Sequence, residues 1–216
     1  MAKRLDGKLE RRVPPEIWDI ERLPDDERLA MLDAIEAYKH TTNTEFKAGA
    51  CAVAFNGEKS VKHNHTNEPG KGQEGHAEML ALSALYDRVN PAARRLKIMA
   101  LAASYPDEEL FRGGDKFENG TRINIKNVNK LDVHRICGRC RKMISDYTGN
   151  SLPDVGEKGK KIKPWDPVIL LLMGNGQVLR TSLSVIEPLP HIPHQTLIRP
   201  WEKNDPQKAP DTYSAK

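Results

Sequence analysis

Two short motifs, some sixty residues apart, constrain the fold of this chain more than any other feature. His76 and Glu78 stand at the start of a segment dense in Ala and Leu, and Cys137 and Cys140 flank Gly-Arg at the start of another predicted helix. A thiolate pair with this spacing can bind one ion from a turn and the first turn of a helix, and an imidazole supplies a third ligand. Three protein ligands leave a fourth position for water, as in catalytic zinc sites. The pattern predicts a Zn²⁺ site made by His76, Cys137 and Cys140.

Glu78 follows His76 by two residues, which places it poorly for binding the same ion. It is well placed to take a proton from the water at the metal and to deliver it to a ring nitrogen of a substrate. Each motif alone has another interpretation. The cysteine pair could be a redox dithiol, and His76 and Glu78 could be a helix cap and a favourable first-turn acid. The two motifs together favour a catalytic metal site.

The cysteine count and the termini bear on the compartment. The chain has three cysteines, an odd number with one close pair, which suits metal binding in a reducing compartment better than a disulfide framework. Cys51 lies in an Ala-rich predicted strand and is expected to be a small buried hydrophobe and not a ligand. No run of about 18 apolar residues and no apolar signal segment is present. A cytoplasmic protein that does not enter the membrane is expected.

The first helix is predicted to begin near Pro24. Asp25 is expected to cap it, and Leu29, Leu32 and Ile35 recur at helical spacing. These three side chains are therefore expected to define its apolar face.

Three segments predict strands. Residues 47–67 contain two strands joined at Asn56-Gly57, a dipeptide that readily takes the positive φ angles of a tight turn. Residues 97–104 form a buried strand, and residues 168–183 form a hairpin through Gly-Asn-Gly. A three-residue connection joins only antiparallel strands, because a parallel pair needs a crossover of about a dozen residues or more.

The length of 216 residues suits one domain with extensions or two very small ones, and we favour one. An N-terminal arm is expected over residues 1–23, because it contains a Pro-Pro pair and scattered charge. The domain is expected over residues 24–190. Polar insertions are expected at about 105–131 and 149–166, and a Pro-rich C-terminal extension at 191–216.

The order of these motifs resembles the cytidine deaminase superfamily, whose signature is His or Cys followed by Ala-Glu, and later Pro-Cys-x-x-Cys. Ile136 stands here in place of the proline, which is not a ligand. The resemblance implies a three-layer α/β/α fold with a mixed sheet that ends in an antiparallel hairpin. It also implies hydrolysis of an exocyclic amine with Glu78 as the proton carrier.

Residues 25–190 resemble the free-nucleoside cytidine deaminases and their blasticidin deaminase relatives. The segment TEFKAGACAV resembles the first-strand motif of that branch, which implies that Phe46 contacts the base. The backbone N–H of Ala77 is implied to hold the base carbonyl. Polynucleotide deaminases have a parallel last strand pair, so the predicted antiparallel hairpin favours the nucleoside branch.

One departure from the family concerns the sugar. Relatives carry Asn-x-Glu-Asn on the second strand, where the Asn and Glu bind the ribose hydroxyls, and this chain has Asn-His-Thr-Asn beginning at Asn64. Asn64 is carried over as a substrate contact, but Thr66 stands in place of the acid, and Glu68 could replace it only if the loop is remodelled. The remaining nearby histidines are expected to be surface or supporting residues and not ligands: His63, His65 and His134.

These features predict a zinc-dependent enzyme that deaminates a cytosine-type nucleoside to its uracil form and ammonia, and that forms a homo-oligomer, a dimer or a tetramer. Two alternatives stay open. One is a deaminase of cytosine in single-stranded nucleic acid, whose backbone the basic ends and insertions would contact. The other is a non-catalytic zinc-binding protein, which a fourth Cys or His ligand would indicate.

Overall fold

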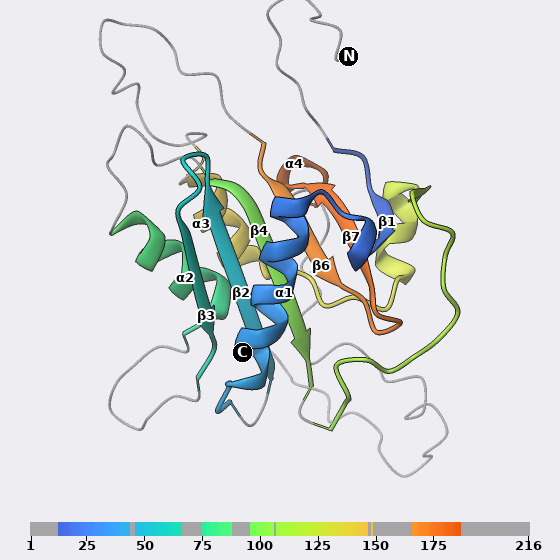
Figure 1. Cartoon of the computed structure of the whole chain (residues 1–216), viewed down its shortest axis with the longest axis horizontal. Coiled ribbons are helices and arrows are strands. Elements are labelled where there is room, and N and C mark those ends of the chain that lie inside the picture. The colour runs from blue at the N-terminus through green and yellow to red at the C-terminus, as the bar shows by residue number, and fades with distance from the viewer. Residues whose placement is uncertain are drawn as a thin grey trace, which may run out of the picture.

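A seven-stranded mixed sheet forms the centre of the molecule in the computed structural model (Figure 1). The structure describes residues 13–43, 46–65, 75–87, 96–105, 107–146, 148 and 166–186. Across the sheet the strands are β3 (Lys59–His63), β2 (Lys47–Ala54), β4 (Leu96–Ser104), β6 (Val168–Leu172), β7 (Gln177–Ser182), β1 (Glu16–Asp19) and β5 (Thr121–Arg122). The pair β4/β6 is parallel, and the other neighbouring pairs are antiparallel.

Helices cover both faces of this sheet. They are α1 (Asp25–Lys39), α2 (Ala77–Tyr86), α3 (Gly138–Ser145) and the short α4 (Leu183–Ile186), with the 3-10 segments η1 (Ile20–Arg22) and η3 (Ile125–Lys130). Successive residues of a strand point to opposite faces, and in β2 Cys51 packs in the cluster that contains α1, whereas Ala50 and Ala52 pack in the cluster that contains α2 and α3. The predicted three-layer α/β/α fold with a mixed sheet is confirmed.

The first helix begins where the sequence predicts, but not with the predicted cap. Pro24 occupies the N-cap position, and Asp25 is the first helical residue. The side chain of Asp25 accepts a hydrogen bond from Arg28 instead of from a backbone N–H at the helix start. Acidic side chains in the first turn are still favourable there, because they face the positive end of the helix dipole.

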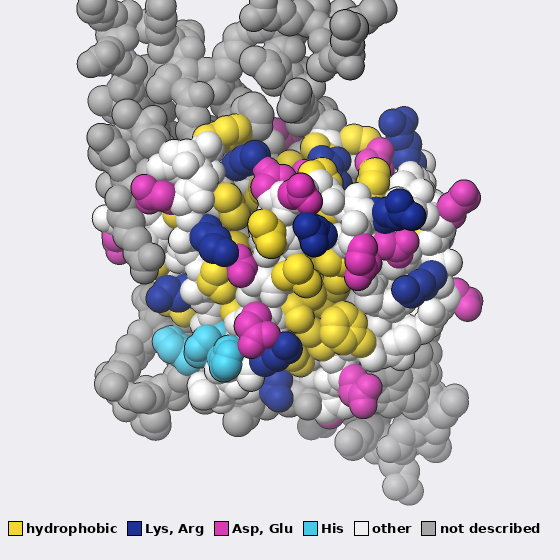
Figure 2. Space-filling view, viewed as in Figure 1, with side chains coloured by type: hydrophobic (Ala, Val, Ile, Leu, Met, Phe, Trp, Pro, Cys, Tyr) yellow, Lys and Arg dark blue, Asp and Glu magenta, His cyan; other side chains and the backbone are white. Residues whose placement is uncertain are grey.

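The buried face of α1 also differs from the prediction. Ile35 is buried, but Leu29 is 54% exposed and Leu32 is 44% exposed. Ala30 and Ala34 face the sheet instead, and small side chains at these positions let the helix lie close to it. Hydrophobic side chains accordingly reach the surface on the face that α1 covers (Figure 2). The helix itself was predicted correctly, but close packing against the sheet buries the face with Ala30 and Ala34 and leaves Leu29 and Leu32 exposed.

The three predicted strand regions are confirmed. The β2/β3 hairpin turns through Gly57 at φ 86°, and the β6/β7 hairpin turns through Gly176 at φ 82°. Glycine adopts such positive φ angles without the steric cost that other residues meet. Because β6 and β7 are antiparallel, the topological expectation for the last hairpin is also met.

The sheet continues beyond that hairpin, which the sequence analysis did not anticipate. Residues 16–19, which we assigned to an N-terminal arm, form β1 and pair with β7, and Ile17 is fully buried. An edge strand with unpaired backbone groups readily accepts such a partner. The sheet therefore begins at Glu16 in sequence, before the predicted domain start at residue 24.

The segment predicted as an insertion at about 105–131 contributes to the sheet and to the core. It supplies β5, which pairs with β1, and it buries Val128. Arg112 and the neighbouring Asp132 pack over Gly174 of the last hairpin. Residues 149–165 of the second predicted insertion, at about 149–166, and the predicted extension at 191–216 lie outside the described residues. No helix among the described residues is long and apolar enough to span a membrane.

Close approach of α1 to β2 yields a stability prediction. A methyl group at Gly49 would overlap the carbonyl oxygen of Ala34 and the backbone nitrogen of Tyr38. We expect Gly49→Ala to lower the free energy of unfolding by about 1 to 3 kcal/mol or more, because backbone cannot move aside as a side chain can. Urea denaturation measures this change.

The matched control is Gly57→Asn, since a Cβ at Gly57 meets nothing within 4 Å and asparagine tolerates positive φ. The positive φ of 86° still strains a side chain at Gly57, so the free energy of unfolding should fall by about 0.5 to 1 kcal/mol, less than for Gly49→Ala. Equal effects of the two substitutions would contradict the close-packing explanation.

Candidate active site

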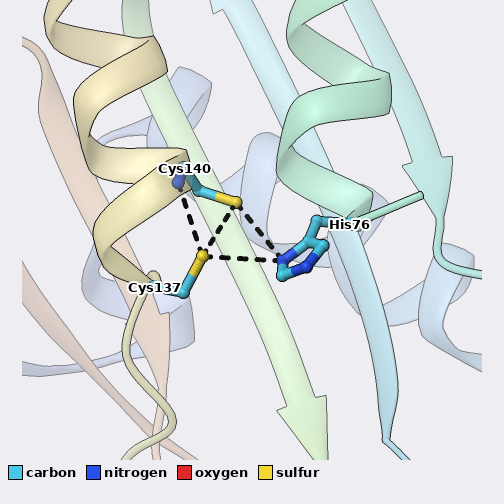
Figure 3. A group of neighbouring side chains, drawn as sticks. All are labelled: His76, Cys137 and Cys140. Carbon is cyan, nitrogen blue, oxygen red and sulfur yellow. Dashed lines mark hydrogen bonds between the residues drawn. The ribbon is translucent and has the colours of Figure 1, made fainter. Parts of the chain in front are cut away.

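Two helix N-termini bring the three predicted metal ligands together. His76 is the N-cap residue of α2 and Cys137 is the N-cap residue of α3, and Cys140 lies one turn into α3. Nδ1 of His76 lies 3.6 Å from Sγ of Cys137 and 3.5 Å from Sγ of Cys140 (Figure 3). The two sulfur atoms are 3.3 Å apart. These donors converge on one point although the chain separates them by some sixty residues.

The spacing of the donors fits a tetrahedral zinc ion. With Zn–S bonds of about 2.3 Å and a Zn–N bond of about 2.0 Å, tetrahedral angles put sulfur about 3.5 Å from nitrogen and about 3.8 Å from sulfur. The observed nitrogen–sulfur distances of 3.5 and 3.6 Å agree, and the sulfur pair at 3.3 Å would need to open slightly. Among the described residues this group has three members, which leaves a tetrahedral ion one further position. The group could therefore hold an ion of the catalytic type.

The two thiols share one hydrogen bond and have opposite pKa shifts. The hydrogen bond between the two sulfur atoms lowers the pKa of Cys137 to about 3, and burial opposes that shift. The same bond, together with burial, raises the pKa of Cys140. The backbone N–H of Cys140 also donates to Sγ of Cys137, as expected for an N-cap side chain. One thiolate is thus already favoured, and a cation would favour the second.

Glu78 lies in the first turn of α2, next to the donors but outside the group that could hold a metal. Its side chain is buried, with 6% of its surface exposed. Burial raises the pKa of Glu78, and the negative charge of Cys137 raises it further. A carboxyl group with a raised pKa can accept and release a proton near neutral pH. The role of Glu78 as a proton carrier stays a prediction.

Ala77 stands between these residues as the first residue of α2 and is fully buried. Backbone N–H groups in the first turn of a helix have no partner within the helix and can donate to a ligand. This position is compatible with the predicted contact to a base carbonyl, which no observation tests.

Phe46 precedes β2, and its ring contacts two other aromatic rings, those of Tyr105 and His134. The sequence did not predict this grouping. Its ring centre lies 5.5 Å from that of Tyr105 and 5.3 Å from that of His134, both in edge-to-face geometry. Tyr105 directly follows β4, and His134 precedes Cys137 by three residues. Proximity in sequence to a metal ligand was the only signal for His134. The predicted base contact of Phe46 stays a prediction.

Asn64 is buried, and most of its carboxamide is bound within the protein. Its Oδ1 accepts hydrogen bonds from the backbone N–H of Ala48 at 2.8 Å and from the hydroxyl of Thr41 at 2.7 Å. Its Nδ2 donates to the carbonyl oxygen of Phe46. Asn64 thus joins the end of β3 to the start of β2. A sugar contact by Asn64 stays a prediction, and Thr66 and Glu68 lie outside the described residues.

Among the residues that the structure describes, the metal group does not include Cys51, His63, His65 or His134. Cys51 is fully buried in β2, and burial raises its pKa to about 12, in agreement with the expected hydrophobic role. His65 forms an isolated bridge with Gly75, next in sequence to the predicted ligand His76. His65 is exposed and His63 and His134 are half-buried, with 9% of the His134 side chain exposed.

Solved structures with a similar fold are cytidine deaminases. The enzyme from Burkholderia pseudomallei is 21% identical, with a TM-score of 0.44, over 72% of this chain and 91% of that chain. The enzyme from Mycobacterium leprae is 16% identical, with a TM-score of 0.42, over 74% and 95%. The enzyme from Mycobacterium tuberculosis is 19% identical, with a TM-score of 0.38, over 62% and 100%. No protein-family model and no curated protein sequence matches the chain.

The lowered pKa of Cys137 and the raised pKa of Cys51 predict that an alkylating reagent distinguishes these two cysteines. After treatment with a chelator, iodoacetamide at pH 7 should modify Cys137 and leave Cys51 intact in the folded protein, because the thiolate is the reactive form and Cys51 stays protonated up to about pH 12. Peptide mass spectrometry locates the label. Added zinc should protect Cys137, and modification of Cys51 before Cys137 would contradict the assignment.

Proposed function

We propose that this protein is a zinc-dependent hydrolase that removes the exocyclic amine of a cytosine-type nucleoside, with the uracil form and ammonia as products. The observation that carries the proposal is the convergence of His76, Cys137 and Cys140 within 4.8 Å beside the buried carboxyl group of Glu78. Three donors and a separate acid suit hydrolysis at a metal better than a closed structural site, which uses four protein ligands.

Zinc bound at this site would supply Lewis-acid activation of water. Neutral His76 and two thiolates offset the charge of the ion completely, so the site needs no further charged group to be neutral. The residue after Glu78 is Met79, where three-cysteine relatives often carry an arginine. The ligand set and its neighbour are consistent with each other.

Glu78 moves the protons in the proposed reaction. It accepts a proton from the attacking water and delivers one to N3 of the base, and a second proton goes to the departing amine. Oxygen adds to ring carbon 4 as N3 takes up its proton. The second proton comes from the added hydroxyl group and passes through Glu78 to the amine, and the carbon–nitrogen bond then breaks to release ammonia. The raised pKa of Glu78 suits this work, because a carboxyl group that titrates nearer neutrality both accepts and returns protons.

The remaining pocket contacts are assigned by position. The backbone N–H of Ala77 would hold the base carbonyl, Phe46 would pack against the base, and Asn64 would reach the sugar with the part of its carboxamide that the protein leaves available. A homo-oligomer, a dimer or a tetramer, and a cytoplasmic location belong to the same proposal.

Cytosine in single-stranded nucleic acid is the second candidate substrate. The antiparallel β6/β7 pair speaks for the nucleoside branch, because a parallel last pair is the feature by which polynucleotide deaminases differ. Ammonia release from a panel decides between them: cytidine, deoxycytidine, cytosine, deoxycytidine monophosphate, adenosine, blasticidin S and single-stranded DNA. We expect the highest kcat/KM with a cytosine nucleoside or its analogue. A higher value with single-stranded DNA would establish the second candidate.

Substitution of the proton carrier tests the mechanism. Glu78→Gln should retain bound zinc and lower kcat by about 10²- to 10⁴-fold, because the amide cannot accept the proton. Zinc content by atomic spectroscopy and kcat on the best substrate measure the two effects.

Two control variants separate metal binding from proton transfer. Cys137→Ser should lose zinc and activity together, since a hydroxyl is a much weaker zinc ligand than a thiolate. Glu109→Gln, at an exposed position, should change neither. Full activity in Glu78→Gln would contradict the assignment of Glu78 as the proton carrier.

A further inference from the structure

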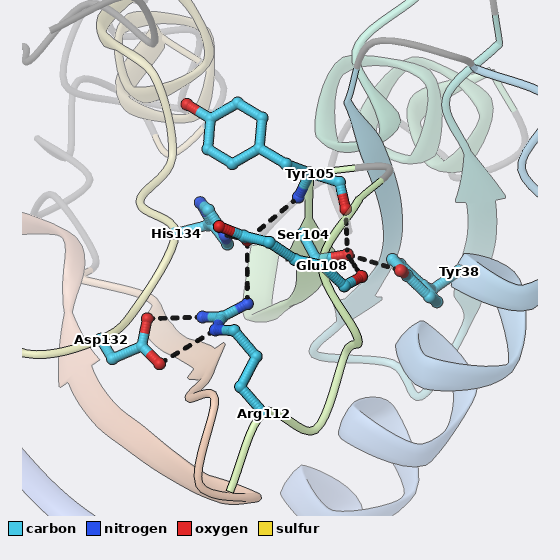
Figure 4. A network of polar contacts seen from close by, with 7 residues as sticks. All are labelled: Tyr38, Ser104, Tyr105, Glu108, Arg112, Asp132 and His134. Carbon is cyan, nitrogen blue, oxygen red and sulfur yellow. Dashed lines mark hydrogen bonds and ion pairs between the residues drawn. The ribbon is translucent and has the colours of Figure 1, made fainter. Parts of the chain in front are cut away.

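One buried carboxylate connects several groups at the edge of the candidate site. Oε2 of Glu108 lies 3.3 Å from the backbone nitrogen of Tyr105, 3.2 Å from Nη1 of Arg112 and 3.4 Å from Nε2 of His134 (Figure 4). Arg112 in turn donates to both carboxylate oxygens of Asp132, at 3.0 and 2.5 Å. The side chains of Glu108 and His134 are 13% and 9% exposed. The contacts around Glu108 and His134 are thus shielded from water, where polar contacts are stronger than at the surface, whereas Asp132 is 60% exposed.

Tyr105 and His134, the two ring-bearing residues beside Glu108, also form an aromatic triangle with Phe46. The ring centres of Phe46, Tyr105 and His134 are 5.3 to 5.5 Å apart, and the ring planes meet at 70° to 78°. The centre of such a triangle lies about 3 Å from each ring centre, which is shorter than the roughly 3.5 Å of a carbon–carbon contact. No ligand atom fits between the rings, so the triangle is a packed unit in which each ring fixes the other two.

Strand register places this triangle beside the candidate site. Lys47 pairs with Ser104 at the end of the β2/β4 ladder, so Phe46 and Tyr105 each lie one residue beyond the last pair. His134 comes from the segment that leads to Cys137 three residues later. Ser104 also bonds to Tyr38 at the end of α1, which ties this corner of the sheet to the helix layer. The triangle therefore joins the sheet edge to the loop that carries a metal donor.

We propose that Glu108 is a positioning residue for the substrate pocket. It accepts a hydrogen bond from the backbone nitrogen of Tyr105 and lies against the ring edge of His134, and these two residues pack against Phe46. The inference rests on the proposed function, in which Phe46 packs against the base. The segment between β4 and α3 is accordingly part of the pocket wall and not a peripheral insertion.

Loss of Glu108 should weaken binding more than chemistry. Glu108 acts through Phe46, and a packing contact to the base is made equally in the ground state and the transition state. Removal of such uniform binding raises KM and leaves kcat unchanged. A general structural defect would instead lower kcat and zinc content together.

The test compares four variants with the wild type on cytidine and deoxycytidine. Glu108→Ala should raise KM about tenfold with kcat within about twofold, and Glu108→Gln, which keeps an acceptor oxygen, should raise KM less than about threefold. His134→Ala should reproduce the effect of Glu108→Ala, whereas His134→Phe keeps a ring edge against Phe46 and should retain a lower KM than His134→Ala. If Glu108→Ala does not fold, the two His134 variants decide the question.

Cytidine binding can be measured separately from turnover, and Glu109, exposed and adjacent to Glu108, provides a control. In the Glu78→Gln background, Glu108→Ala should weaken cytidine binding by the same factor in calorimetry, with zinc content unchanged. Glu109→Ala, at the exposed adjacent position, should leave KM and kcat as in the wild type. An active wild type with an unchanged KM in Glu108→Ala, or a loss of zinc in that variant, overturns this inference alone. A wild type without ammonia release, and a Glu78→Gln variant that binds no cytidine, overturn the proposed function and this inference with it.

Discussion

Two helices on one face of the sheet begin at the same point, and the candidate site exists because they do. His76 and Cys137 are the N-cap residues of α2 and α3, so their side chains leave the helices at the ends where backbone N–H groups point outward. Both helices pack on the same buried cluster as β2 and β4. The sheet must hold both helices rigidly, since a shift of either by an ångström would separate His76 from the two sulfur atoms.

Burial makes negative charge on the thiols and on Glu78 unfavourable unless a cation is present. Glu78 and Cys140 are almost fully buried, and burial raises the pKa of both. Charged groups removed from water need a partner of opposite charge, or they take up a proton and become neutral. A divalent ion changes this balance, because it stabilises both thiolates at once. Burial in the same low-polarity environment raises the pKa of the Glu78 carboxyl group.

Polar residues outside the ligand set organise the surroundings of the site. The carboxamide of Asn64 bonds to the backbone of Phe46 and Ala48, and Glu108 accepts a hydrogen bond from the backbone nitrogen of Tyr105, whose ring packs against Phe46. Asn64 bonds directly to the carbonyl oxygen of Phe46. Glu108 contacts Tyr105 and His134, whose rings pack against the ring of Phe46. The position of this one aromatic ring thus depends on contacts from β3, from the end of β4 and from the loop before α3.

Sequence alone determined the features that depend on neighbours along the chain. The turn at Gly57, the antiparallel last hairpin and the residues that could hold zinc follow from local geometry and from ligand chemistry. Tertiary structure decided which face of α1 is buried, because Leu29 satisfies helical spacing as well as Ala30 but does not allow the close approach to Gly49. It also decided that residues 16–19 form a strand and that His134 meets Phe46. Those contacts join segments far apart in sequence, and only the folded sheet brings such segments together.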